Sequence, residues 1–249
     1  MPSKQHGHFA GGALHTTRAV VLRTFKHSDK STVLKACTEV FGVRTYFVRT
    51  GAKGAAKVAA LQPLERIELV VTEAAERELH TVREVRVERP YLHVHTDPMR
   101  GLLALFTQEV LYKTLREEAG DAALFATIQR LLERMDTEAD AALYPLELVI
   151  GLMDHLGIRP MPPEAEEDRF DMREGHFFHG RDRHEFCIGP AESVLLARWL
   201  RSEDGAAPRP PGSAAERRSL LNHLLVYFRL HVDGFGELRS LPVLQAILA

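Results

Sequence analysis

Residues 19–50 read AVVLRTFKHSDKSTVLKACTEVFGVRTYFVRT. In this region, short runs rich in Val, Leu, Thr, Phe and Tyr are separated by turn-forming residues at 27–29 and 41–42. Apolar and polar residues alternate within the runs, and this period of two is typical of β-strands with one buried face. We therefore predict three strands, at 19–25, 31–38 and 43–50.

Two further runs of the same kind follow, at 66–72 and 79–87. Between the third and fourth predicted strands, residues 55–61 are rich in alanine, which favours a helix, and Pro63 ends that segment. Five strands with one short helix after the third is the order of elements in an OB-fold barrel. The region 16–90 is therefore predicted to be a five-stranded OB-fold barrel, preceded by a flexible tail at 1–15.

From Pro98 onward, the apolar residues recur at helical spacing. The clearest case is an apolar stripe from Leu124 to Met135, which follows Asp121, a residue suited to cap a helix N-terminus. A last short helix is expected to open at Ser240 and Pro242. The other helices are predicted at 99–118, 124–135, 143–156, 191–201 and 214–231.

Two segments interrupt the helical pattern. Residues 169–188 alternate aromatic and polar side chains around Gly175 and Gly180, which indicates a small β-hairpin. Residues 203–213 are rich in Pro, Gly and Ala, and we expect a flexible surface loop there. The chain is thus predicted to be an α+β multidomain protein, with a mainly α-helical domain at 91–249 that carries the inserted hairpin.

The charge is distributed unevenly along the chain. The 249 residues carry a formal net charge of -2, yet residues 1–60 hold ten Lys and Arg against two acidic residues, a net charge of +8. A basic N-terminal third on an acidic body indicates a localised patch for a polyanion. A solvated strand face, on which Lys and Arg are common, is the alternative explanation of the charge alone.

Composition excludes several other classes of protein. A hydrophobic content of 45% and a charged content of 27% are ordinary for a globular protein. No apolar run approaches the ~18 residues of a membrane span, and residues 1–14 lack the apolar core of a signal peptide. Cys37 and Cys187, the only cysteines, form no disulfide framework or CxxC motif. We therefore expect a cytoplasmic protein.

The local signatures of enzymes are absent from the sequence. Residues 51–57 contain glycines and lysines, but not at P-loop spacing, and no HExxH, GxSxG or GxGxxG motif occurs. A protein without catalytic activity is therefore expected. Four side chains could in principle hold Zn²⁺ by their spacing, but solvent-exposed histidines explain that cluster better in a chain with 13 histidines. These four are His176, His179, His184 and Cys187.

Basic residues alternate with aromatic ones in the first three predicted strands. Positive charge follows phosphates and aromatic faces stack on unpaired bases, a combination typical of proteins that bind single-stranded nucleic acid without sequence preference. About half of each strand points into the barrel, so most of the aromatics are expected in the core and one or two at most as stacking platforms.

Five short motifs follow one another in the N-terminal region: Val20 to Thr24 (VVLRT), Ser28-Asp29, Thr38-Glu39 with Gly42, Gly51 to Lys53 (GAK) and Leu61 to Leu64 (LQPL). In their order and spacing, these motifs resemble the RecO family of DNA repair and recombination proteins. The later segments are similar to the version found in Bacteroidetes-type bacteria. They are Phe106 to Leu115, Phe170 to Gly175, Tyr227 to His231 and Leu238 to Ser240.

This resemblance implies an OB-fold domain before a helical domain, in a nucleoid-associated recombination mediator. Such a protein binds single- and double-stranded DNA, anneals complementary strands and, with RecR, helps to load RecA onto DNA covered by single-strand-binding protein. It also implies contact with the acidic C-terminal tail of single-strand-binding protein, which we expect near Arg229, His231 and Arg239. The implied DNA-binding residues are Arg23, Lys35, Arg44, Arg49, Lys53 and Lys57.

The resemblance implies no cofactor. Many members hold a four-cysteine zinc site in the inserted hairpin, whereas that region has only Cys187 here, so no metal is implied. Two other functions are also compatible with the sequence. The barrel could serve as an OB-fold adaptor that docks protein partners, or the histidine cluster could hold the metal of a nucleic-acid-processing enzyme.

Overall fold

The computed structural model describes residues 13–49, 59–73, 79–137, 140–201 and 212–247. The chain forms two compact units. The first comprises Met1–Pro90 together with Leu115–Phe125, and the second comprises Tyr91–Thr114 and Ala126–Ala249. The segment 115–125, which the sequence placed in the helical domain at 91–249, is grouped with the barrel in this division, and the predicted domain bounds stay a prediction.

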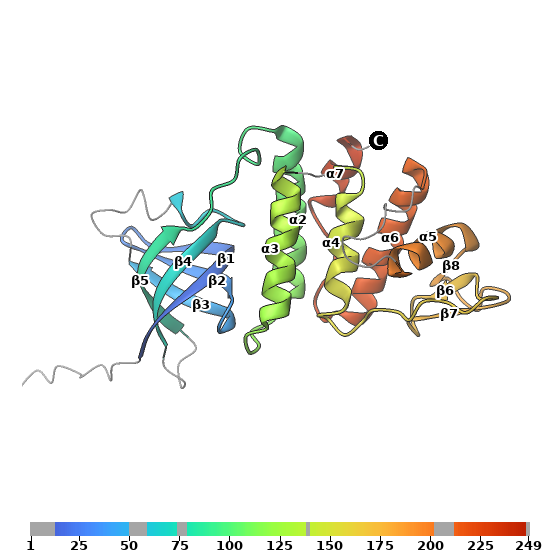
Figure 1. The fold of residues 1–249 in the computed structure, drawn as a ribbon, viewed down its shortest axis with the longest axis horizontal. Helices are drawn as coiled ribbons and strands as arrows, with labels where there is room; N and C mark the ends of the chain where they lie inside the picture. Colours follow the sequence, from blue (N-terminus) through green and yellow to red (C-terminus); the bar gives the residue numbers. More distant parts are fainter. Residues whose placement is uncertain (1–12, 50–58, 74–78, 138–139, 202–211, 248–249) are drawn as a thin grey trace, which may run out of the picture. The chain divides into compact units, whose positions relative to one another are not determined.

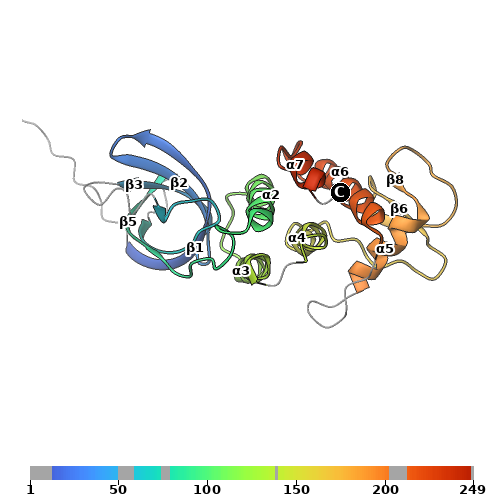
Figure 2. The same cartoon turned by 90° about the horizontal axis from the view of Figure 1, so that it is seen from above.

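The first unit is a closed five-stranded barrel (Figures 1 and 2). The strands pair in the order β1-β2-β3-β5-β4, and every pair is antiparallel except β3 with β5. The predicted OB-type barrel is therefore confirmed. Its strands are β1 (Ala13–Ser28), β2 (Ser31–Thr38), β3 (Gly42–Arg49), β4 (Arg66–Glu73) and β5 (Leu79–Val87).

The start of β1 corrects the predicted tail. Residues 13–15 were expected in the flexible segment, but they pair with β4, from Ala13 opposite Glu73 to His15 opposite Val71. Their side chains are exposed, so no buried apolar face marked them as a strand in the sequence. Residues 1–12, most of the predicted helix at 55–61 and most of the predicted loop at 203–213 lie outside the described residues.

Alternate residues of each strand fill the barrel. Tyr46 is the largest of them and is fully buried, and Leu61 packs against the same cluster. Because side chains alternate across a strand, the residues between these positions face the outside of the barrel. The inward-facing core consists of Ala19, Val21, Leu34, Ala36, Tyr46, Val48, Ile67, Leu69, Val71 and Val82.

Two glycines allow the segment after α2 (Pro98–Thr114) to lie against the barrel. A Cβ atom on Gly42 would overlap the carbonyl oxygens of Glu118 and Ala119, and one on Gly120 would overlap that of Val40. Gly42 also has a φ of +69°, a conformation that other residues rarely adopt. The helix α2 ends at Thr114, before this close approach, whereas the sequence predicted a helix as far as 118.

The chain leaves this contact through a capped helix. The Asp121 carboxylate accepts hydrogen bonds from the backbone N–H groups of Ala123 and Leu124, at 2.9 and 3.0 Å. It thereby satisfies two donors that the first turn of a helix leaves without a partner. The helix α3 (Ala122–Thr137) starts there, as the sequence predicted.

The second unit is built from packed helices. The helix α6 packs against α4 and α5, and α2 packs against α4 and α7 (Figures 1 and 2). In α6, Ser213 and Glu216 form a reciprocal capping box, and the helix has the bounds that the sequence predicted. The helices are α4 (Tyr144–Met153), α5 (Pro190–Arg201), α6 (Ala214–His231) and α7 (Leu241–Ile247).

Helix α2 holds the loop between α6 and α7. The Glu109 carboxylate accepts hydrogen bonds from the backbone N–H of Arg239 and from the N–H and hydroxyl of Ser240. One turn later, Lys113 donates to the carbonyl oxygens of Phe235 and Glu237. Burial would raise the pKa of Glu109, but these donors and Lys113 outweigh it and lower the pKa.

The predicted hairpin at 169–188 is a three-stranded sheet. Its order is β7-β6-β8, formed by β6 (Arg169–Asp171), β7 (His176–Phe178) and β8 (Cys187–Ile188). The third strand has only two residues, too few to give a periodic signal in the sequence. Among the described residues, no helix of the chain is both long and apolar enough to cross a membrane.

The close approach at Gly120 makes a testable prediction about stability. We expect Gly120→Ala to destabilise the protein by at least about 3 kcal/mol, because the new methyl group overlaps the backbone of Val40. The free energy of unfolding in urea measures this. The matched control is Gly101→Ala in α2, where the methyl group meets ordinary packing at 3.7 Å and should stabilise by about 0.5–1 kcal/mol. Equal effects of the two substitutions would contradict the close contact between Gly120 and the backbone of Val40.

Candidate nucleic-acid interface

The outer side of β1, β2 and β3 gathers cations and aromatic rings. Directly paired residues of neighbouring strands point to the same side of a sheet. Arg23 is paired with Lys35, which is paired with Thr45 on β3. Two residues further along the strands, the next set of outward-facing residues pairs Phe25 with Val33 and Val33 with Phe47. We name the cationic-aromatic face by its five residues, Arg23, Phe25, Lys35, Phe47 and Arg49.

The aromatic rings of this face are accessible. Phe25 is 41% exposed, which is unusual for a large apolar side chain on a strand. The Arg23 guanidinium carbon lies 4.9 Å from the centre of the Phe25 ring, within range of a cation–π interaction. The His27 ring meets the Phe47 ring edge-on at 5.7 Å. The face therefore offers flat, partly exposed rings beside positive charge.

An acidic side chain lies at one end of the same face. The Glu117 carboxylate is 3.7 Å from the Lys35 ammonium and accepts a hydrogen bond from the Thr45 hydroxyl at 2.9 Å. Lys35 is 24% exposed and Glu117 is 47% exposed. A partly solvated ion pair of this kind contributes about 0–1 kcal/mol, so a phosphate oxygen can replace the carboxylate at small cost.

Arg44 is placed differently from the other predicted DNA-binding residues. It lies on β3 two residues before Tyr46, so its side chain is on the same side of the strand as Tyr46 and Val48, which are inside the barrel. Its guanidinium donates hydrogen bonds to the carbonyl oxygens of Val43 and Glu118, at 3.0 and 3.1 Å. Arg44 therefore ties the segment 115–121 to the barrel end.

The structure brings three of the six predicted DNA-binding residues together. Arg23, Lys35 and Arg49 share the outer face, and Arg44 lies at the barrel end. Lys53 and Lys57 lie outside the described residues. The contact of all six with DNA stays a prediction. Phe25 is one of the aromatic residues that alternate with basic ones in the first three predicted strands, of which one or two at most were expected as stacking platforms, but it was not among the predicted DNA-binding residues.

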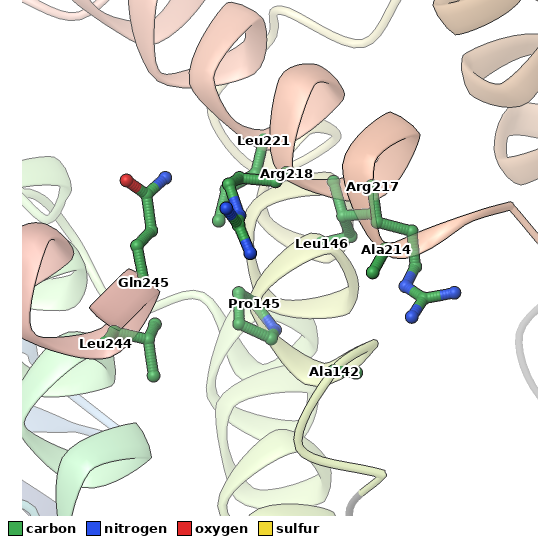
Figure 3. Close-up of a pocket in the computed structure, with 9 residues that line it drawn as sticks. All are labelled: Ala142, Pro145, Leu146, Ala214, Arg217, Arg218, Leu221, Leu244 and Gln245. Atoms are coloured by element: carbon green, nitrogen blue, oxygen red, sulfur yellow. The ribbon is translucent and has the colours of Figure 1, made fainter. Parts of the chain in front are cut away.

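A second candidate site is an apolar pocket of about 40 Å³ in the helical unit (Figure 3). Its walls come from α4, α6 and α7, and its apolar part is formed by Pro145, Leu146, Leu221 and Leu244. Arg218 points from α6 into the mouth of this pocket. Arg217 points away and donates a hydrogen bond to the carbonyl oxygen of Gly212.

The predicted partner-binding residues lie elsewhere in the same unit. His231 is hydrogen-bonded to the carbonyl oxygen of Met172 at 2.8 Å and packs on the Tyr227 ring. The backbone N–H of Arg239 binds Glu109. Arg229 is exposed near the C-terminal end of α6. His231 thus holds the small sheet against α6, and partner binding by these three residues stays a prediction.

The histidine cluster divides in the structure. His184 accepts a hydrogen bond from the Phe186 N–H at Nδ1, so its Nε2 carries the proton and donates to Asp171 at 3.1 Å. The Cys187 sulfur lies 3.7 Å from the same Nδ1. His179 instead contacts the carbonyl oxygen of Glu166. Among the described residues, Asp171, His184 and Cys187 form the one group close enough to share an ion.

Asp171 organises this group. It is 2% exposed, and its carboxylate accepts hydrogen bonds from the N–H groups of Arg173 and Glu174 as well as from His184. Burial would raise the pKa of this carboxyl, but the three donors outweigh burial and hold the pKa below its ordinary value of 3.8. The carboxylate therefore stays charged and fixes the turn after β6.

Comparisons with known proteins agree with the fold. Residues 13–91 match the family model described as "Recombination protein O N terminal". The "DNA repair protein RecO" of Flavobacterium johnsoniae is 28% identical over 238 residues, which cover 94% of this chain and 98% of the relative. The protein of the same name from Bacteroides fragilis is 29% identical over 239 residues, with 94% and 99% covered. That of Phocaeicola vulgatus is 28% identical over 242 residues, with 95% and 100% covered.

The state of Asp171 predicts a pH dependence. Because its pKa is lowered in the folded protein, the carboxylate contributes stability above about pH 4, and this contribution is lost as the pH falls through the folded-state pKa. We expect Asp171→Asn to lose about 1.5–3 kcal/mol at pH 6 and less than that at pH 3, below the ordinary pKa of the carboxyl. Urea unfolding at the two pH values measures the difference. A deficit of the same size at pH 3 would contradict the role of the charge.

Proposed function

We propose, from the premise that this chain is a RecO family protein, that it is a non-catalytic recombination mediator which binds DNA strands through its barrel. The name shared by its relatives supports a role in DNA repair or recombination. In this proposal the protein binds single- and double-stranded DNA and anneals complementary strands. With RecR, it helps to load RecA onto DNA covered by single-strand-binding protein.

The cationic-aromatic face is the observation that supports this function best. Cations at Arg23 and Arg49 lie on either side of the Phe25 and Phe47 row, so phosphates and bases can be held by adjacent side chains. Contacts between cations and DNA phosphates, and stacking of rings on bases, carry no sequence information, so a strand bound in this way is held without sequence preference. A mediator that must act on any broken chromosome needs this tolerance.

The two alternatives make different demands on the same face. An adaptor that docks protein would bury Phe25 and Phe47 against an apolar partner, and its DNA affinity would be weak or absent. A metal-dependent enzyme would need an ion near the substrate. Among the described residues, the group that could hold an ion is Asp171, His184 and Cys187, which belongs to the helical unit. The five residues of the cationic-aromatic face are cations and rings, which bind phosphates and bases but no metal ion, so this face favours the mediator.

Charge reversal on the face predicts a loss of DNA affinity. We expect Arg23→Glu with Arg49→Glu to weaken binding of labelled single-stranded DNA by at least about tenfold, equally for different base compositions. The slope of log affinity against log salt should become less steep by about 0.7 for each lost phosphate contact. Fluorescence anisotropy across a salt series measures both, and Lys53→Glu with Lys57→Glu should act in the same direction.

The matched control for this experiment is Arg86→Glu. Arg86 is a highly exposed arginine on β5 and pairs with Glu84, away from the cationic-aromatic face. It should leave the affinity and the salt slope nearly unchanged. An equal effect of all three variants would indicate attraction by overall charge. Salt-insensitive binding by the unmodified protein would favour the adaptor.

The pocket of the helical unit is our proposed contact for the acidic tail of single-strand-binding protein. Apolar walls at Pro145, Leu221 and Leu244 suit an apolar side chain of the tail, and Arg218 at the mouth suits a neighbouring carboxylate. Arg229, His231 and Arg239 line no part of this pocket. The two locations can be separated by experiment.

We expect Arg218→Glu to weaken binding of a synthetic acidic-tail peptide by about tenfold, because the carboxylate meets a like charge. Arg229→Glu, on the same helix, tests the location that the sequence predicted. The peptide affinities, measured by calorimetry, identify the site. A loss with Arg229→Glu alone would place the contact near the C-terminal end of α6.

A further inference from the structure

A second pocket lies in the barrel unit, on the inner side of the β1–β2 hairpin. Thr24 and Lys26 on β1 and Thr32 on β2 alternate with the outward residues of the same strands, so their side chains point to the side opposite Phe25. Leu61 and Gln62 form the other wall. We name this space of about 260 Å³ the hairpin pocket.

The size of the hairpin pocket limits its ligand. Pockets for drug-sized molecules measure about 300–1,000 Å³, and this pocket is slightly smaller. A single flat heterocycle fits such a space, whereas a duplex or a folded peptide does not. The ligand is therefore a fragment of a chain or a free small molecule.

The chemistry of the lining suits a nucleobase. Leu61 is 2% exposed and supplies an apolar surface for the face of a ring. The hydroxyls of Thr24 and Thr32 each donate and accept hydrogen bonds, so they can pair with the edge of any of the four bases. A lining of this kind binds a base without choosing its identity.

The rim of the hairpin pocket suits the phosphate that accompanies a base. Lys26 pairs with Asp29 at 2.9 Å, and their side chains are 76% and 90% exposed. An ion pair so accessible to water contributes little to stability. A phosphate oxygen can therefore replace the Asp29 carboxylate at Lys26 at small cost, while the attached base enters the space between Thr24 and Thr32.

We propose that the hairpin pocket takes one unstacked base from a DNA strand bound on the cationic-aromatic face. This inference rests on the proposed DNA binding. Arg23 and Phe25 face one side of β1, while Thr24 and Lys26 face the other. The strand β1 can therefore contact both the bases stacked on the cationic-aromatic face and the single base that enters the hairpin pocket. A base paired in a duplex must first be unpaired, at a cost of a few kcal/mol, so the pocket favours single-stranded DNA.

The test uses the full-length protein and a single-stranded oligonucleotide that contains 2-aminopurine. Entry of this base into the hairpin pocket separates it from its neighbours, so its fluorescence should rise on binding. We expect Thr24→Val with Thr32→Val, which keeps the shape and removes the hydroxyls, to abolish most of that rise. The same variant should bind single strands about tenfold more weakly, and duplex DNA as the unmodified protein does.

The controls separate the hairpin pocket from DNA binding as a whole. Thr16→Val changes an exposed threonine of β1 away from the hairpin and should leave both signals unchanged. Unaltered single-strand affinity and fluorescence in the double variant, with normal salt-dependent binding, would overturn the base pocket and leave the proposed function standing. Absence of DNA binding by the unmodified protein would overturn both. A loss of duplex and single-strand affinity by the same factor would also overturn the pocket.

Discussion

The contact between the β2–β3 turn and the segment 115–121 determines how the barrel end is built. Two backbones can approach this closely because Gly42 and Gly120 lack side chains. The contact places the Glu118 carbonyl oxygen against Arg44 and the Glu117 carboxylate beside Lys35. It also sets where α3 begins, since Asp121 caps that helix directly afterwards. A packing constraint at two glycines therefore controls the charge at the edge of the cationic-aromatic face.

The barrel uses the two sides of its strands for different purposes. Alternation directs apolar residues such as Tyr46 and Val48 inward and leaves Phe47 and Arg49 outside, so stability and binding involve separate sets of side chains. Near the turn of the β1–β2 hairpin, the inner side becomes polar at Thr24 and Thr32. The hairpin is therefore the place where both sides of one sheet can meet the same ligand.

Local patterns in the sequence predicted most of the fold. The five strands follow from a period of two, and α6 follows from the helical spacing of apolar residues after Pro98. The side of the barrel on which Arg44 lies was also predictable, because Arg44 is two residues before Tyr46 on the same strand. The ion pair of Glu117 with Lys35 and the hydrogen bond of His184 to Asp171 were not predictable, because each joins residues that no local pattern links. Strand β8 is too short to leave any pattern, and its place depends on pairing with β6.

The two cysteines differ in a way that gives experimental access to the protein. Cys37 is 2% exposed in the barrel, and burial with the nearby Asp121 charge raises the pKa of its thiol to about 12. A thiol-specific dye reacts with the thiolate and has to reach the sulfur, so this position stays unlabelled in the folded state. Cys187 is partly accessible at the surface of the helical unit. The natural sequence therefore carries a single attachment point for a fluorophore, and it leaves the outer side of the barrel unmodified.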